Sequence, residues 1–226
     1  MNLSVVIPWD PRTKDEHRLM SLSVIETNIQ LIPGIEIKLG EDTSQPFNRS
    51  KARNNGVMQS SGDNILILDA DTFIPVCSML EAEEILKFSN WVIPYNIYYN
   101  LNQTKTHEAY EDLSVLSTEP VDGEYDHRIL SWAGALMVSR ENFDKVGGYD
   151  ERFEGWGWED VAFRVKLDNE VGHHSRCGSY VSHLWHPRPP EIEFGNEFEK
   201  RNAKLFDKEY RRKYNWRDER TQKLFV

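Results

Sequence analysis

Two aspartates, Asp69 and Asp71, directly follow the short apolar run Asn64–Leu68, NILIL. Such a run predicts a buried strand, and side chains two residues apart on an extended chain point to the same side. Two carboxylates with this spacing suit Mg²⁺ or Mn²⁺, particularly where a diphosphate completes the coordination shell. Aspartate is also common in turns after strands, so a simple turn pair is the alternative interpretation.

Two histidines with H-x-x-H spacing, His183 and His186, lie at and just after the end of another strand candidate, residues 178–183. An imidazole beside two carboxylates favours Mn²⁺ over Mg²⁺. A structural zinc site is not expected, because no cysteine ligand lies nearby in the sequence. Histidines satisfied in the core or at the surface are the alternative.

The stretch 152–165, RFEGWGWEDVAFRV, places Trp156 and Trp158 just before the acid pair Glu159 and Asp160. Acids in the first turn of a helix are ordinary, because the helix dipole favours anions there. Aromatic rings beside carboxylates can also hold a sugar, with the ring under its apolar face and the carboxylates on its hydroxyls. Core packing of the tryptophans is the alternative.

The first ninety residues alternate strand and helix patterns, which predicts parallel βαβ units. Strands are expected at 3–8, 35–39, 64–68, 91–94, 132–138 and 178–183, and helices at 13–31, 48–60, 78–88, 140–146, 158–169 and 192–214. Residues 95–130 are expected to form an irregular insertion with one helix near 106–117. Open α/β sheets bind ligands at the carboxyl ends of their strands, where Asp69 and Asp71 would lie.

The composition narrows the classes of function. The 226 residues carry 27 Lys and Arg against 37 Asp and Glu, a net charge of −10, which opposes tight binding of nucleic acid or anionic lipid. The 2 cysteines lack C-x-x-C spacing, which argues against a disulfide scaffold. The sequence shows no signal peptide and no run of about 18 apolar residues that a transmembrane helix needs. We therefore expect a cytoplasmic protein.

The D-x-D, G-W-G-x-E-D and H-x-x-H elements, in this order, resemble those of metal-dependent GT-A glycosyltransferases. SWAGALMVSRENFDKVGGYDERFEGWGWEDVAFRVKL is similar to the carboxyl-terminal segment of the β-1,4-galactosyltransferases and bacterial chondroitin polymerases. NRSKARNNGVMQSSGDNILILDADT is similar to the nucleotide-binding half of the wider family-2 transferases. The resemblance covers about residues 3–187.

This resemblance implies a single α/β domain of GT-A (Rossmann-like) fold, with a mostly parallel central sheet flanked by helices. Residues 1–190 would form this domain, with a nucleotide-binding half at 1–94 and an acceptor-binding half at 95–190. Residues 191–226 would form a helical tail packed on the domain.

The resemblance also implies roles for individual residues. Asp69, Asp71 and His186 would bind the metal, with His183 as the alternative histidine. Asp42, Arg49, Arg53, Asn54, Asp69 and Trp156 would hold the nucleotide-sugar. Asp160 would be the general base, and Glu159 would orient the acceptor. The helix dipole lowers the pKa of such a base, so burial would have to raise it again.

The implied activity is metal-dependent transfer of a sugar from a nucleotide-sugar, with a UDP-sugar favoured, to a glycan or other hydroxyl acceptor. Mn²⁺ or Mg²⁺ would be the cofactor, and the E-D pair favours inversion. Residues 187–199 would close over the donor. One departure bears on the acceptor: the galactosyltransferase pattern has two glycines between the tryptophan and the acid pair, whereas Trp158 directly precedes Glu159 here.

Three other functions are alternatives to this one, and the sequence weighs against two of them. A sugar-binding module of the same fold could keep the tryptophans without catalysis. A nucleotidyltransferase would normally show a Gly-rich basic loop after the first strand, and residues 9–12, WDPR, are not such a loop. A transferase acting on nucleic-acid bases has the charge of −10 against it.

Overall fold

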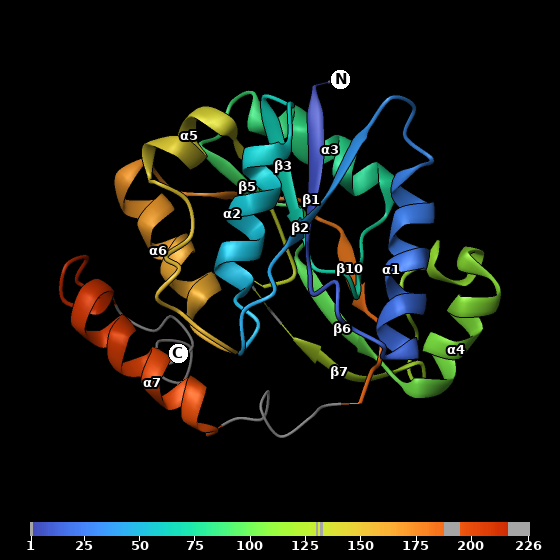
Figure 1. The fold of residues 1–226 in the computed structure, drawn as a ribbon. Coiled ribbons are helices and arrows are strands. Elements are labelled where there is room, and N and C mark those ends of the chain that lie inside the picture. Colours follow the sequence, from blue (N-terminus) through green and yellow to red (C-terminus); the bar gives the residue numbers. More distant parts are fainter. Residues whose placement is uncertain (1, 130, 132, 188–194, 217–226) are drawn as a thin grey trace, which may run out of the picture.

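A six-stranded sheet forms the centre of the computed structural model, which describes residues 2–129, 131, 133–187 and 195–216 (Figure 1). In spatial order its strands are β2 (Glu36–Glu41), β1 (Leu3–Trp9), β3 (Asn64–Leu68), β8 (Ala135–Ser139), β5 (Trp91–Ile93) and β9 (Ser175–Arg176). The pairs β1–β2, β1–β3 and β5–β9 are parallel, and β8 is antiparallel to both β3 and β5. The prediction of an α/β fold with a largely parallel central sheet is confirmed.

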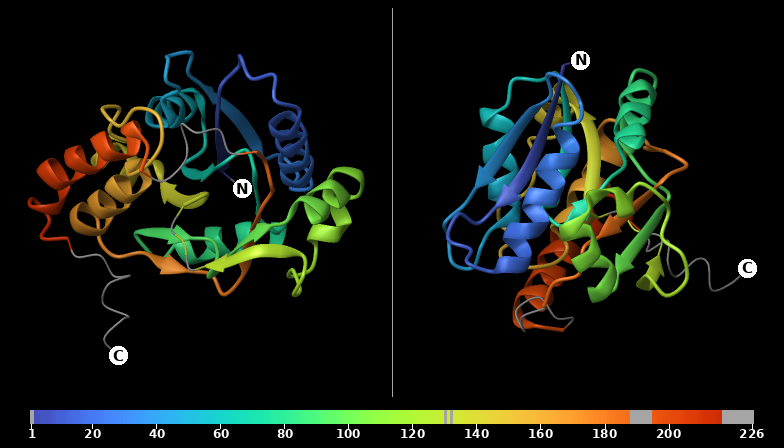
Figure 2. Two further views of the ribbon diagram at one scale, coloured as in Figure 1. Left: turned by 90° about the horizontal axis from the view of Figure 1, so that it is seen from below. Right: turned by 90° about the vertical axis from the view of Figure 1, so that its right-hand side faces the viewer.

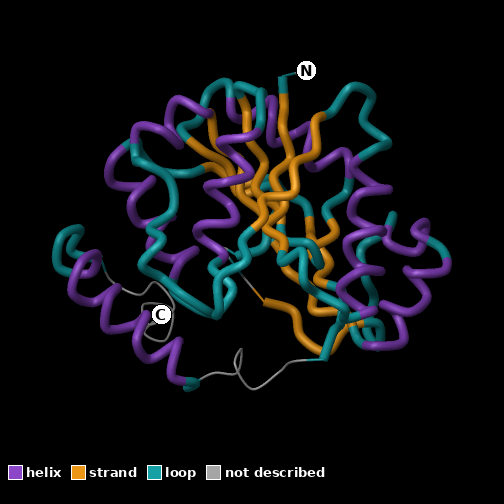
Figure 3. Tube along the Cα trace, viewed as in Figure 1, coloured by secondary structure: helices purple, strands orange, loops and turns teal. Residues whose placement is uncertain are grey.

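Helices cover both faces of this sheet (Figure 3). They are α1 (Glu16–Ile29), α2 (Arg49–Gln59), α3 (Val76–Leu86), α5 (Arg140–Lys145) and α6 (Glu159–Glu170). The β1 and β3 strands read as near-continuous Val, Ile and Leu because strands between two helical layers are buried on both faces. Asn48 begins α2 by accepting a hydrogen bond from the Lys51 amide.

Close packing of α2 on the sheet depends on one glycine. A Cβ on Gly56 would lie 2.4 Å from Cγ1 of Val6, so a larger residue would push the helix away from β1. The helix therefore lies against the sheet, and its amino-terminal end reaches the edge where β1 and β3 end.

A second, four-stranded sheet lies beside the first. Its order is β4 (Thr72–Phe73), β10 (Tyr180–His183), β6 (Ile97–Leu101) and β7 (Tyr125–Ile129), and α4 (Gln103–Glu111) and a 3₁₀ turn (Leu113–Leu116) connect β6 to β7. The prediction that residues 95–130 form an irregular insertion was therefore wrong, although α4 and the 3₁₀ turn overlap the one helix expected near 106–117. Tyr98 and Tyr99 are neighbours in β6 and both are buried. The strand is therefore stabilised by packing of aromatic side chains and does not show a simple alternation of polar and apolar residues.

The last described helix, α7 (Glu197–Phe206), continues into a π-helical turn at Asp207–Arg211. It lies beside α6 in Figure 1 and in the left-hand view of Figure 2. A small second core joins the two regions, and its buried members are Phe153, Ala162, Val165, Phe206 and Tyr210. Parts of the predicted strand 132–138 and helix 192–214, at residues 132 and 192–194, lie outside the described residues, as do residues 217–226 of the predicted tail. In the described part of the chain, no helix combines the length and apolarity that crossing a bilayer requires.

Candidate active site

A cavity of about 850 Å³ opens at the carboxyl ends of β1 and β3, next to the second sheet. Seven of its lining side chains are ionisable groups that the sequence singled out: Arg49, Asp69, Asp71, Glu159, Asp160, His183 and His186. The three motifs, which are far apart in the chain, therefore meet at one cavity. This position is the one where open α/β sheets bind their ligands.

Asp71, His183 and His186 form a cluster whose possible ligand atoms all lie within 4.8 Å of one another. Oδ1 of Asp71 is 3.6 Å from Nε2 of His183, and its Oδ2 is 3.4 Å from Nε2 of His186. Both histidines of the H-x-x-H motif thus face the same carboxylate. The sequence had treated them as alternatives.

Strand pairing brings this cluster together. In the antiparallel β4–β10 pair, His183 lies opposite Thr72, the residue after Asp71. The amide of Leu184 donates to the carbonyl oxygen of Asp71 at 2.8 Å, which holds the H-x-x-H segment against the D-x-D turn. The backbone amide of Trp185 is held in turn by the Thr106 hydroxyl of α4 at 2.8 Å.

The donor atoms of the cluster suit a divalent cation. Nδ1 of His186 lies 2.9 Å from the carbonyl oxygen of Pro187, so Nε2, which faces Asp71, is the ring nitrogen placed to coordinate a cation. Burial acts to raise the pKa of Asp71, but the charge of His183 and the hydrogen bond from His186 hold it below its ordinary value. An ionised carboxylate with two imidazoles is a mixed oxygen and nitrogen set, which suits Mn²⁺ better than Mg²⁺.

Asp69 lies outside this cluster and contacts Arg53 instead. The Arg53 side chain is only 2% exposed, and its Nη2 donates to Oδ1 of Asp69 at 2.9 Å. Nη1 of Arg53 lies 2.9 Å from Oδ1 of Asp160 and 3.6 Å from Oε1 of Glu159. One buried guanidinium therefore joins the D-x-D motif to the acid pair at the start of α6.

Within the acid pair, Asp160 has the electrostatics of a base near neutrality. Burial raises the pKa of Asp160 to about 7, with Glu159 and Asp69 adding to the rise and Arg53 opposing it. A quarter of the Asp160 side chain (25%) stays exposed, and it faces the cavity. Its carboxylate can therefore accept a proton from a molecule bound there.

The two tryptophans of the G-W-G-W stretch differ in position. Trp156 lines the cavity, whereas the Trp158 ring packs 4.9 Å from the Phe206 ring of α7 and does not line it. Trp158 is also the residue that precedes α6, with a left-handed φ of 74°. The core-packing interpretation thus holds for Trp158, and of these two tryptophans Trp156 is the one that lines the cavity.

Of the remaining predicted nucleotide ligands, Arg49 lines the cavity, whereas Asn54 and Asp42 do not. Arg49 lines the cavity and donates to the carbonyl oxygen of Gly155 at 2.9 Å. Asn54 lies away from the cavity and holds the backbone of Tyr149 through both its amide and its carbonyl.

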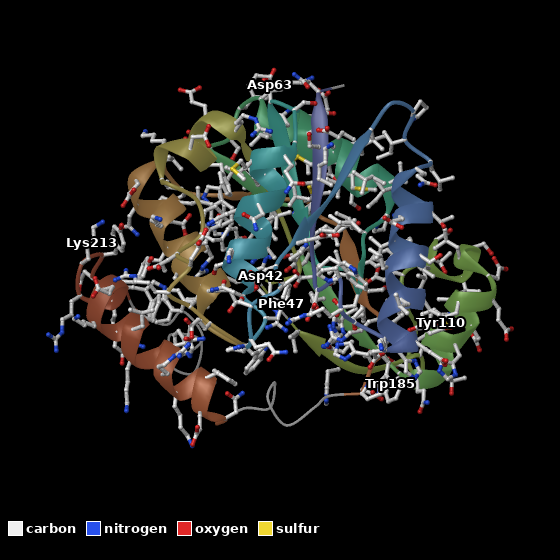
Figure 4. The ribbon with its side chains drawn as sticks, viewed as in Figure 1. Asp42, Phe47, Asp63, Tyr110, Trp185 and Lys213 are labelled. Carbon is white, nitrogen blue, oxygen red and sulfur yellow. The ribbon has the colours of Figure 1, made fainter. Side chains whose placement is uncertain are left out.

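Asp42 is also away from the cavity lining and organises the β2–α2 loop. Its carboxylate accepts hydrogen bonds from the backbone amides of Ser44 and Asn48 and from the Ser44 hydroxyl, and it lies 3.2 Å from Nζ of Lys51. It lies with Phe47 at the lower end of α2 (Figure 4), and Phe47 of the same loop does line the cavity. Asp42 therefore shapes a wall of the cavity through the loop.

Sequence reasoning missed several cavity residues. Tyr98 and Asn100 of β6 and His127 of β7 line it, as do Trp9 and Asp10 at the end of β1. The β6 and β7 residues were hidden because 95–130 was interpreted as irregular, although the run IYYNL at 97–101 has the aromatic and β-branched content of a strand. Of the segment 187–199 that was expected to close over the donor, residues 188–194 lie outside the described residues.

Comparison with known proteins shows the family of the chain. A family model described as glycosyltransferase-like family 2 matches residues 20–174. Polypeptide N-acetylgalactosaminyltransferase 8 of Drosophila melanogaster is 31% identical over 127 residues, which cover 52% of this chain and 20% of that protein. The chain thus spans about a fifth of the length of this relative.

Several solved structures share the fold at low sequence identity. The catalytic domain of Drosophila β1,4-galactosyltransferase 7, solved with xylobiose, superimposes with a TM-score of 0.52 and 16% identity, covering 89% of this chain and 79% of that one. S. aureus TarS 1–349 with UDP-GlcNAc gives 0.56 and 13%, covering 84% and 60%. GalNAc-T7 with UDP, GalNAc and Mn²⁺ gives 0.54 and 14%, covering 93% and 50%.

Proposed function

Because the chain belongs to the glycosyltransferase-like family 2, we propose that it transfers a sugar from a UDP-sugar to an acceptor hydroxyl, with inversion and with a bound divalent cation. The observation that carries this proposal is the single cavity lined by both the Asp71, His183 and His186 cluster and the Asp160 carboxylate. Such a transfer needs a cation site for the leaving diphosphate and a base for the acceptor within one site.

Asp71, His183 and His186 would hold the cation, and Mn²⁺ fits their mixed ligand set. A cation bound there would supply positive charge to the departing nucleoside diphosphate. GalNAc-T7 was solved with UDP and Mn²⁺ and TarS with UDP-GlcNAc, which supports the choice of a uridine donor for this chain.

Asp160 would act as the base. Its carboxylate takes the proton of the acceptor hydroxyl while that oxygen bonds to the anomeric carbon and the bond from this carbon to the diphosphate oxygen breaks. The pKa of about 7 suits this role, because a base with a pKa near the working pH is ionised and still binds a proton well. Attack from the face opposite the leaving group gives inversion.

Arg53 would position both carboxylates without touching the substrate. Its guanidinium bonds to Asp69 and Asp160, and its side chain is almost fully buried. This contact fixes the distance between the D-x-D turn and the base. Trp156 would cover a sugar bound in the cavity, and Glu159 would orient the acceptor.

Thermal melting with nucleotides tests the proposal directly. The purified protein is melted with UDP, GDP, CDP or dTDP, each with and without Mn²⁺, and UDP-sugars follow. A ligand at about 100 times its Kd adds about 2.7 kcal/mol, or roughly 5–10 °C for a chain of this size. We expect a manganese-dependent shift with UDP that Asp71→Ala abolishes. No shift with any nucleotide would favour the sugar-binding module instead.

The acceptor and the compartment are further parts of the proposal. A glycan is the proposed acceptor, supported by the aromatic face that Trp156 presents to the cavity. The cytoplasmic location stays a prediction from the sequence, which cell fractionation with an antibody against the chain would check.

A further inference from the structure

The loop Gly155–Trp158, which carries Trp156 and leads into the acid pair, has an unusual backbone. Gly155, Gly157 and Trp158 have φ values of 71°, 99° and 74°. Left-handed backbone is uncommon for a residue other than glycine, and a bulky one such as tryptophan is seldom found there. Trp158 also provides no side-chain cap for α6. Such a loop keeps one conformation only where contacts from elsewhere hold it.

Asn202 of α7 supplies three of these contacts. Its side chain is buried, at 1% exposure, and its Nδ2 donates to the carbonyl oxygens of Glu154, Trp156 and Gly157 at 2.9, 3.3 and 3.0 Å. An amide nitrogen has two hydrogens, so one of them is shared between two carbonyls. The whole donor capacity of this side chain is therefore directed at the loop backbone.

Neighbouring residues of α7 hold the same loop. Phe198 packs so closely on Gly155 that a Cβ there would lie 2.7 Å from its Cγ. Oε1 of Glu199 accepts a hydrogen bond from the Trp158 indole at 2.8 Å. Across the loop, Arg49 at the start of α2 binds the Gly155 carbonyl. The loop is thus fixed between α2 and α7 (Figures 1 and 2).

We infer that α7, which follows the region matched by the family model, completes the active site, and that Asn202 is a positioning residue for Trp156 and Asp160. The loop ends at the first residues of α6, so the position of the loop backbone sets the position of the Asp160 carboxylate. Asn202 touches neither the cavity nor the Asp71 cluster, so it should affect the reaction without weakening the binding of UDP and Mn²⁺. The part of this inference that concerns turnover rests on the proposed function.

The decisive variant is Asn202→Asp, which keeps the shape of the side chain and replaces the donor by a carboxylate facing three carbonyls. The first measurement is amide hydrogen exchange, followed by mass spectrometry of peptides covering residues 152–160. We expect exchange in this stretch to accelerate about 10- to 100-fold, the range that the loss of such hydrogen bonds gives. Peptides of β1, β3 and α2 should keep their wild-type rates.

The second measurement separates positioning from a general loss of structure. The Kd of UDP with Mn²⁺, and the KM and kcat for hydrolysis of the UDP-sugar that gives the largest melting shift, are compared with wild type. We expect the Kd and KM to stay within about threefold and kcat to fall at least about tenfold, as misplacing a catalytic group can cause.

Asn169→Ala is the matched control, because Asn169 also donates an amide hydrogen bond to a backbone carbonyl, that of Val165 in α6. It should change neither exchange at 152–160 nor kcat. If Asn202→Asp fails to fold, Trp158→Phe removes the indole donor to Glu199 while keeping the ring against Phe206, and the same results are expected.

Unchanged exchange at 152–160, or equal acceleration throughout the chain, would overturn the inference. So would faster exchange in the loop with wild-type kcat. If the wild-type protein binds no nucleotide, the proposed function fails, but the exchange data still decide whether α7 holds the loop.

Discussion

The two ends of the cavity are built in different ways. At the end of the proposed cation site, which we call the metal end, Asp71 and His183 lie at or beside the ends of paired strands, and the backbone bond from Leu184 to Asp71 fixes their register. At the end of the proposed base, which we call the base end, Glu159 and Asp160 follow a left-handed loop whose conformation depends on α7. Groups at the metal end are thus placed by regular structure, and groups at the base end by contacts distant in sequence.

The largest effect should come from removing the carboxylate of the metal end. Asp71→Ala leaves two histidines without their shared anion, so we expect complete loss of the manganese-dependent melting shift with UDP. Outer-sphere residues alone typically cost 10- to 100-fold in metal affinity, and the loss of a ligand should exceed about 100-fold. Asp63→Ala, at the opposite end of the molecule (Figure 4), is the matched control and should keep the shift. A preserved shift in Asp71→Ala would place the cation elsewhere.

A smaller and different effect is expected at the base end. Asp160→Asn removes the proton acceptor but keeps the side-chain shape, so kcat should fall by about 10²–10⁴, the usual contribution of a general base. The Kd of UDP with Mn²⁺ should stay close to the wild-type value, which isothermal titration would measure. Turnover at the wild-type rate in a folded Asp160→Asn protein would remove Asp160 from this role.

The metal end could be predicted from the sequence more readily than the base end. The NILIL run and the H-x-x-H spacing are local patterns, so the strand ends and the candidate ligands Asp71, His183 and His186 could be found without the structure. The link from Arg53 to Asp69 and Asp160 could not, because it joins a helix to two distant loops through one buried side chain. Asn202 gave no local signal either, since its three partners lie more than forty residues away.

The fold shows the same contrast. Alternating strands and helices in the first ninety residues obey periodicities set by burial on two faces, and they were predicted correctly. The β6 and β7 strands were missed because some of their polar and aromatic residues line the cavity, which removes the usual alternation of polar and apolar residues. Tertiary contacts decide the structure there.

The pH dependence of turnover should sharpen the assignment of the base. Because the pKa of Asp160 is raised to about 7, the carboxyl is protonated below that pH and cannot accept the acceptor proton. We expect kcat/KM to fall about tenfold per pH unit below about 7. The small residual rate of Asp160→Asn should lack this dependence, and a wild-type profile flat between pH 5 and pH 8 would contradict the assignment.

The smallest effect should appear in stability. An acid with a raised pKa in the folded state keeps its proton between about pH 4 and pH 7 while the unfolded chain releases it. The Asp160 contribution to the free energy of unfolding is therefore largest at low pH and declines as the pH rises to about 7. Urea unfolding of wild type and Asp160→Asn should show a difference that declines across this window by up to about 1.4 kcal/mol per pH unit. If this difference in the free energy of unfolding increased with pH instead, the pKa of Asp160 would not be raised in the folded protein.

The second core, made by Phe153, Ala162, Val165, Phe206 and Tyr210, is small and separate from the main one. Few buried contacts mean a low free energy of local opening, so this region should unfold before the central sheet does. Mild heating would then release the loop that leads into Asp160 while the Asp71 cluster stays assembled. If the proposed function holds, the protein would pass through a partly unfolded state that still binds nucleotide but no longer turns it over. A protease would cut near α7 before anywhere in the sheet.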